Sequence, residues 1–248
     1  MARETRLMMG MPITVQIVDT GRDHLIEEAF AYFREVDLRF SLFKPGSEIC
    51  GINRGDVAIA AVSPDMREVL SIAERTKRET HGYFDIKRGD GTLDTSGIVK
   101  GWAIRNVADH LRVGGCSNFY VDAGGDIQSF GKNPAGLDWR VGIRNPFNET
   151  QIIKAVIPNG KGIATSGAYV RGDHIYNPHR PAEPIKEIAS LTVIGPDVLE
   201  ADRFATGAFA MGKEGIGFIE ATHGLEGYMV DANGVATQTS GFGAFVTT

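Results

Sequence analysis

The sequence predicts an α+β fold, because helices and antiparallel-looking strands follow one another without the regular alternation of a doubly wound parallel sheet. Helical periodicity dominates the first half, whereas short apolar runs between Gly, Pro and Asn residues dominate the second. The 248 residues contain no internal repeat, low-complexity tract or obvious linker. We therefore expect one domain over residues 1–248, with a helix-rich part (about 1–115) and a strand-rich part (about 116–248) packed as one unit.

Three helices are expected in the first half, where apolar side chains recur with helical spacing over residues 24–38, 63–82 and 97–112. The second has the clearest start, since Ser63 is a good N-cap and Pro64 suits the first turn. Gly82 is expected to end this helix, and Gly114 the next one. A strand over residues 11–18, where apolar and polar side chains alternate, precedes all three.

The second half is predicted to form short strands between turns, over residues 118–122, 139–144, 152–157 and 188–194. Two helices are expected to follow, over residues 198–211 and 215–223. The last predicted strands lie near residues 228–231 and 235–239. This order of elements favours an α+β arrangement.

The composition is typical of an ordinary enzyme. A net charge of −5 argues against nucleic acid as a partner, since phosphate backbones favour a basic face. The apolar runs are far shorter than a membrane span, and charges stand where a secretory signal would need apolar residues, so we expect a cytoplasmic protein. Cys50 and Cys116 show no CxxC spacing, which favours two reduced thiols over a disulfide or a metal pair.

The most informative stretch covers residues 93–103 and 120–126. It predicts a turn that enters an amphipathic helix, followed by a strand that breaks at Gly124 and Gly125 between acidic residues. A helix start offers free N–H groups to an anion, and paired glycines let the backbone approach a ligand closely. Neither a GxGxxG fingerprint nor a GxxxxGK[ST] loop is present. The pattern predicts a phosphorylated ligand among carboxylates, with a divalent metal as the usual third member.

Two further segments carry aromatic residues, and each has an ordinary alternative. Phe40 and Phe43 stand beside a turn and could form a flat wall for an aromatic ring, although core packing is the better interpretation when they are taken alone. Gly82, Tyr83, Phe84 and Asp85 place two aromatic residues before an acid. On their own these four residues are typical of a helix C-cap with a core aromatic.

Small and polar residues mark two more segments. Residues 164–169 include Ser166 and Gly167, a tight backbone site, and His174 follows within reach of a phosphate or as a simply solvated loop residue. Asp202 and Thr206 lie at i and i+4 of a predicted helix, so their oxygens share one face. Such a pair suits Mg²⁺, but it equally describes a solvated helix face.

Taken together, these segments resemble the ApbE family, the FAD:protein FMN transferases. The likeness rests on a DxSGIxKGxA-like segment, an AGGD turn, an ATSG segment and an ADxxAT segment, at residues 94–103, 123–126, 164–167 and 201–206. Their order and spacing are highly specific, and the likeness covers nearly the whole chain. It implies an ApbE-like, T-fold-related domain of mixed or antiparallel sheets flanked by helices.

The resemblance also implies roles for single residues. Gly97, through its carbonyl, and Asp202 and Thr206, through their side chains, match metal ligands for Mg²⁺ or Mn²⁺, and Asp202 and His174 match catalytic positions. Positions that contact FAD are matched by Met9, Phe43, Tyr83, Phe84, Asp85, Asp94, Lys100, Ser166, Gly167 and His174. Lys100 is a departure, because this position is often acidic elsewhere in the family.

The activity that the resemblance implies is Mg²⁺-dependent transfer of FMN from FAD to a Thr or Ser hydroxyl of an acceptor protein, with release of AMP. Two alternatives stay open at this point. One is a metal-dependent FAD pyrophosphatase that gives FMN and AMP, and the other is a protein that binds FAD without turning it over. The products made from FAD distinguish the three.

Overall fold

An eight-stranded antiparallel sheet forms the centre of the protein in a computed structural model that describes residues 1–167 and 175–247. Its strands are β1 (Ala2–Met8), β2 (Met11–Ile17), β3 (Phe119–Ala123), β4 (Asp126–Phe130), β7 (Gly162–Gly167), β8 (Ile188–Gly195), β9 (Glu226–Asp231) and β10 (Ala236–Gln238). They are arranged in the order β1-β2-β3-β4-β7-β8-β9-β10. The strands of this sheet therefore follow one another in chain order, except that β5 and β6 are left out between β4 and β7. Helices connect several of the neighbouring strands.

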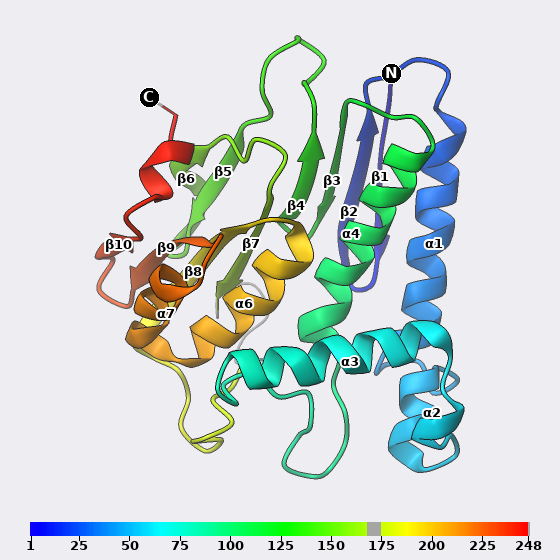
Figure 1. Cartoon of the computed structure of the whole chain (residues 1–248), viewed down its shortest axis with the longest axis vertical. Helices are drawn as coiled ribbons and strands as arrows, with labels where there is room; N and C mark the ends of the chain where they lie inside the picture. Colours follow the sequence, from blue (N-terminus) through cyan, green and yellow to red (C-terminus); the bar gives the residue numbers. More distant parts are fainter. Residues whose placement is uncertain (168–174, 248) are drawn as a thin grey trace.

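The long helices cover one face of this sheet. They are α1 (His24–Phe40), α4 (Ser96–Val113) and α6 (Val198–Ala210), and Figure 1 shows all three in front of the strands. Another long helix, α3 (Pro64–Glu79), crosses one end of this layer. Two short helices, α2 (Glu48–Arg54) and α7 (Gly215–Ala221), complete the set named here. The helix-covered face and the antiparallel sheet are the α+β arrangement that the sequence predicts.

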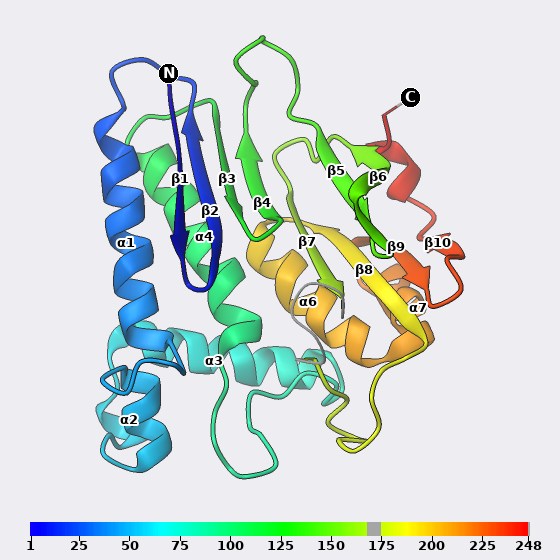
Figure 2. The ribbon, with the colours of Figure 1, turned by 180° about the vertical axis from the view of Figure 1, so that it is seen from behind.

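Among the described residues, a second sheet covers part of the opposite face, in the second half of the sheet. The excursion after β4 forms a two-stranded sheet from β5 (Val141–Asn145) and β6 (Asn148–Val156), which lies over the large sheet in Figure 2. An apolar cluster joins the two sheets and the C-terminal turn, with members Ile127, Val141, Ile143, Val156, Ile163, Tyr228 and Phe242. The strand-rich half therefore has cores on both faces of the sheet, since α6 and α7 form another cluster with β7, β8 and β9.

The core of the first half lies between α1, α4 and strands β2 and β3. Trp102 of α4 is 1% exposed, and its ring lies against those of Tyr32 and Phe40 from α1, with centroids 6.1 and 5.6 Å away. Phe30 and Phe33 on the same helix are fully buried. This packing fixes α4 firmly, and the first turn of α4 is where the sequence predicts the ligand site.

Every helix predicted from periodicity is present, with ends that differ by a few residues. The predicted stop at Gly82 is close: α3 ends at Glu79, and Gly82 adopts φ +83° while its N–H donates to the Lys77 carbonyl at 2.8 Å. Within residues 1–167 and 175–247, no helix has the length and apolar character needed to cross a membrane. Both cysteines are free thiols, as the sequence predicts.

Four elements were missed, namely β1, α2, β4 and β7. Strand β1 is an edge strand whose side chains mostly face solvent, so it lacks a pattern of apolar residues. Strand β7 reads GIATSG, a composition that resembles a turn. The reason is steric, because a Cβ on Gly162 would lie 2.0 Å from the backbone nitrogen of Val198, where α6 begins. The close approach of α6 thus requires glycine inside a strand.

Candidate active site

One pocket gathers most of the residues that the sequence singles out. It opens where the first turn of α4, the middle of α6, the β3–β4 turn and the end of β7 meet. Ten of the predicted site residues line it, namely Tyr83, Phe84, Asp85, Asp94, Gly97, Lys100, Ser166, Gly167, Asp202 and Thr206. Segments separated by more than 100 residues in the sequence therefore meet at one place, as the phosphate-and-carboxylate interpretation requires.

Asp202 lies at the bottom of this pocket and is 2% exposed, so the interpretation of it as a solvated helix residue is wrong. Its Oδ2 accepts the backbone N–H of Gly101 at 2.9 Å. The two helices meet backbone to backbone here, because a Cβ on Gly101 would lie 2.9 Å from the Asp202 Cβ and 3.0 Å from the Leu199 Cα. The absence of a side chain at position 101 is what allows Asp202 to reach the first turns of α4.

The Lys100 ammonium lies between two buried carboxylates. Its Nζ is 2.5 Å from Asp126 Oδ2 and 3.4 Å from Asp202 Oδ1. Burial raises the pKa of Asp202 to about 7; Lys100 opposes this shift, and Asp126 adds to it. The base of the pocket thus carries two acids and one lysine, which together leave a place of negative character for a cation.

Asp126 was not among the predicted site residues, although it is the last residue of the AGGD turn. Gly124 and Gly125, with φ of +62° and +98°, form the tight turn between β3 and β4, and Asp126 is the first residue of β4. Its Oδ1 accepts the N–H of Thr165 from β7 at 3.1 Å. The glycines allow the backbone to turn at the pocket wall, so that an acid directly after them is turned inward. That motif was the signal by which the sequence could have identified Asp126.

Gly97, Thr206 and Asp202 offer the oxygens that a hard cation prefers. A Cβ on Gly97 would lie 3.4 Å from the Thr206 Cγ2, so the two residues are immediate neighbours. Helix geometry would pair the Gly97 carbonyl with the Gly101 N–H, and that N–H also serves Asp202. No group of three or more His, Cys, Asp or Glu residues suited to a metal occurs among the described residues. The set therefore fits Mg²⁺ that keeps other ligands, such as substrate phosphates.

The rim of the pocket is built from half-buried carboxylates that pair with exposed cations. Asp94 lies just before α4, where its Oδ1 accepts the Ser96 N–H at 3.0 Å and its other oxygen pairs with Arg88. Asp85 pairs with Lys77 at 2.7 Å and holds the pKa of that ammonium above its usual range. Each of these carboxylates has a cation of its own, whereas the two carboxylates at the bottom of the pocket share the Lys100 ammonium.

The segment after residue 174 lies at the rim, and two of its members, Tyr176 and His179, were not among the predicted site residues. The Tyr176 hydroxyl donates to the carbonyls of Asp85 and Lys87, at 3.3 Å in each case. The His179 ring meets the Tyr83 ring edge to face, with centroids 4.6 Å apart. These contacts place an aromatic wall at the mouth of the pocket, next to the predicted Tyr83 and Phe84.

Two predicted residues, Phe43 and Met9, do not line the pocket within the described structure, and a third lies outside that part of the chain. Phe43 is 95% exposed in the turn between α1 and α2, so its interpretation as a core residue is wrong, whereas Phe40 does pack in the core. Met9 has φ +53° and, with Gly10, forms the tight turn between β1 and β2. His174 lies outside the described residues.

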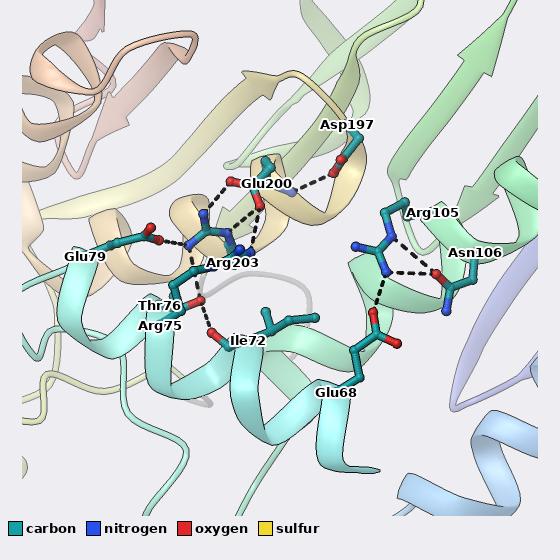
Figure 3. Close-up of polar contacts among 10 residues, drawn as sticks. All are labelled: Glu68, Ile72, Arg75, Thr76, Glu79, Arg105, Asn106, Asp197, Glu200 and Arg203. Atoms are coloured by element: carbon teal, nitrogen blue, oxygen red, sulfur yellow. Dashed lines mark hydrogen bonds and ion pairs between the residues drawn. The ribbon is translucent and has the colours of Figure 1, made fainter. Parts of the chain in front are cut away.

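A buried arginine fixes the orientation of α6 behind the pocket. Arg203 is 3% exposed, and Figure 3 shows its guanidinium between Glu79 of α3 and Glu200 of α6. It also donates to the Thr76 hydroxyl at 3.3 Å. Because Arg203 follows Asp202 directly, this network sets the rotation of the helix that carries the candidate metal ligands.

Known proteins of one family match this chain over the segments that form the pocket. The sequence model of the ApbE family matches residues 9–92 and 87–229. The FAD:protein FMN transferase of Escherichia coli (strain K12) is 35% identical over 168 residues, which cover 63% of this chain and 47% of that protein. That of Haemophilus influenzae is 26% identical over 303 aligned positions, covering 94% and 87%. The chain spans about half the length of the first curated relatives it matches.

Solved structures show the same fold. The flavin transferase ApbE from Vibrio cholerae superposes with a TM-score of 0.85 at 24% identity and covers 98% of each chain. The ApbE protein from Thermotoga maritima superposes with a TM-score of 0.86 at 19% identity, covering 100% of this chain and 99% of that one. At these identities the likeness concerns the fold.

Proposed function

The chain belongs to the ApbE family, and from this premise we propose that it transfers FMN from FAD to a Thr or Ser hydroxyl of an acceptor protein and releases AMP. The observation that carries the proposal is the oxygen set of Asp202, Thr206 and Gly97 beside a pocket with an aromatic rim. A site of this kind needs both features, because FAD combines a charged pyrophosphate with two ring systems. Relatives in the family are named for this activity.

The residues divide the work by their chemistry. Asp202, Thr206 and the Gly97 carbonyl would hold Mg²⁺ or Mn²⁺, which supplies charge neutralisation at the pyrophosphate. The first turn of α4 lines the same region, and the positive end of a helix favours a bound anion. Tyr83 and Tyr176 at the rim offer ring faces and edges for a flat ligand. In the proposed reaction the acceptor hydroxyl attacks the phosphorus on the FMN side, and the bond to AMP breaks.

The test is a product analysis. The protein is incubated with FAD, Mg²⁺ and a peptide that carries a threonine acceptor, and the products are weighed by mass spectrometry. We expect peptide with one FMN attached, together with AMP. FMN and AMP with unmodified peptide would favour the pyrophosphatase alternative, and unchanged FAD would favour a binding protein. A peptide with alanine in place of the threonine is the matched control.

A further inference from the structure

The Lys100 ammonium lies close to the oxygen that the proposed metal requires. Asp202 Oδ2 accepts the Gly101 N–H, so Oδ1 is the oxygen with the greater remaining capacity for a cation. Lys100 Nζ is 3.4 Å from this atom. A lysine carries its charge on a long flexible stem and can move between partners. In this pocket, therefore, a resident ammonium and a divalent cation compete for one carboxylate oxygen.

Asp126 determines where that ammonium rests. Its side chain is 2% exposed, and its Oδ2 lies 2.5 Å from Lys100 Nζ, closer than Asp202 does. Its Oδ1 is fixed by the N–H of Thr165, so the carboxylate cannot follow the lysine toward the pocket centre. The two acids come from different elements, β4 and α6, and each is anchored by a backbone donor. The ammonium is thereby held to the β4 side.

We propose that Asp126 is a positioning residue for the metal site: it keeps the Lys100 ammonium away from Asp202, so that Asp202 can bind a divalent cation. The inference rests on the metal assignment in the proposed function, and it adds a role for a residue outside the predicted ligand set. Without Asp126, the ammonium would lose a carboxylate oxygen 2.5 Å away, while the Asp202 oxygen 3.4 Å away would remain. The attraction to Asp202 would then act without the opposing pull of Asp126, and the ammonium would shift toward Asp202.

The competing explanation is that Asp126 acts on the metal directly, as a ligand or through its charge. The two explanations differ in one respect. If Asp126 acts through the lysine, its removal matters only while Lys100 is present. If it acts on the metal, its removal matters equally when Lys100 has been replaced. A double-mutant cycle measures this difference.

The experiment measures Mn²⁺ binding by calorimetry, with no FAD present, for the wild type, Asp126→Asn, Lys100→Met and the double variant. We expect Asp126→Asn to weaken binding about tenfold or more, within the range of coupling between contacting residues. In the Lys100→Met background the same change should weaken binding only about twofold. Asp138→Asn removes an acid from an exposed pair with Lys132 and is the matched control, expected to leave affinity unchanged.

Equal losses in the two backgrounds would overturn the inference, because they would show a direct effect of Asp126 on the metal. If Asp126→Asn does not fold, as thermal unfolding would reveal, Lys100→Met alone still decides, since loss of the competitor should leave Mn²⁺ affinity unchanged or tighter. Weaker binding by Lys100→Met would overturn the inference. A wild type that binds no Mn²⁺ even when inorganic pyrophosphate is added to supply phosphate ligands would overturn the metal assignment itself and the inference with it. The two kinds of failure are thus distinguishable.

Discussion

The bottom of the pocket and its rim are built on different principles. The charged groups at the bottom, Lys100, Asp126 and Asp202, have side chains 18%, 2% and 3% exposed, and both carboxylates accept a backbone N–H. At the rim, Asp85 and Asp94 also accept backbone N–H groups, but the cations that pair with them, Lys77 and Arg88, have side chains 43% and 49% exposed. Backbone donors thus hold the carboxylates in both places, whereas the paired cation is much more exposed at the rim and therefore less constrained.

This difference indicates a division of labour. Carboxylates that are buried together with their cation keep their geometry when the ligand changes, which suits a cation and a reacting phosphate. Exposed ion pairs contribute little to stability and rearrange at low cost, which suits a surface that admits FAD and then an acceptor. We therefore expect substitutions at the bottom to have large effects on turnover and stability. Substitutions at the rim should have small effects, mainly on FAD affinity.

Asp202→Ala should give the largest effect. It removes the buried carboxylate of the proposed metal set, and we expect a fall in turnover on the order of 10³-fold, comparable to removal of a group that stabilises transition-state charge. The measurement is FAD consumption across a Mg²⁺ titration. Asp197→Ala is the matched control: it removes the N-cap of the same helix, which should cost about 1 kcal/mol of stability and leave turnover in place. Normal, EDTA-insensitive turnover by Asp202→Ala would contradict the metal assignment.

Gly101→Ala tests the backbone contact that brings α4 to α6. The new Cβ would lie 3.0 Å from both the Leu199 Cα and the Val198 carbonyl oxygen, so the helices must separate. We expect a loss of about 1–3 kcal/mol in the free energy of unfolding, together with weaker Mn²⁺ binding. Gly217→Ala in α7 is the control, because no atom lies within 4 Å of its added Cβ. It should stabilise the protein by up to about 1 kcal/mol through helix propensity. Equal unfolding free energies for both variants would contradict the close-contact argument.

The sequence could predict the parts of this site that depend on local spacing. The pair of Asp202 and Thr206 follows from one helical turn, and the start of α4 follows from its glycine and hydroxyl residues. The burial of Asp202 could not be predicted from the sequence. It depends on Gly101 of α4 and on the contacts that Arg203 makes with α3, and both involve other helices, far from Asp202 in the sequence. Local spacing carries no information on such contacts.

The same limit explains the residues that were missed or misplaced. Asp126 acquires its role from Lys100 and Thr165, and Tyr176 from carbonyls about 90 positions earlier in the chain. Phe43 was assigned to a core or ring wall because of its chemistry, yet it lies 95% exposed in a turn. An aromatic residue beside a turn has no local signal that distinguishes these outcomes.

Thr206→Ala should have a smaller effect than Asp202→Ala. The cation loses one neutral oxygen, which water can replace, so we expect about a tenfold fall in turnover that raised Mg²⁺ partly restores. Thr206→Ser keeps the hydroxyl and is the matched control. The measurement is turnover as a function of Mg²⁺ concentration. A fall in turnover as large as that of Asp202→Ala, with no recovery at high Mg²⁺, would show that the hydroxyl has a role beyond that of a replaceable metal ligand.

Tyr176→Phe examines the rim. The hydroxyl makes hydrogen bonds of 3.3 Å to two carbonyls, and the ring remains after the substitution. We expect FAD affinity to fall by about two- to fivefold, because a neutral hydrogen bond contributes about 0.5–1.5 kcal/mol. Flavin fluorescence gives the affinity, and Tyr83→Phe is a comparison at the same rim. Loss of turnover at saturating FAD would contradict the prediction, because it would show that Tyr176 acts in the reaction, as the groups at the bottom of the pocket are expected to do.

The smallest effect is expected at Asp90, in the exposed rim loop. Thr92 donates to its Oδ1 from the hydroxyl at 2.6 Å and from the N–H at 2.9 Å, and these bonds hold the pKa of Asp90 below its usual range. A lowered pKa means that the contribution to stability is present above the ordinary carboxyl pKa and is lost as pH falls through the lowered value. Because the group is fully exposed, Asp90→Asn should leave unfolding and FAD affinity at pH 7 unchanged. An NMR titration of the carboxyl should show a midpoint that rises in Thr92→Val. An unchanged midpoint would contradict this prediction, because it would show that the hydrogen bonds from Thr92 do not lower the pKa of Asp90 in solution.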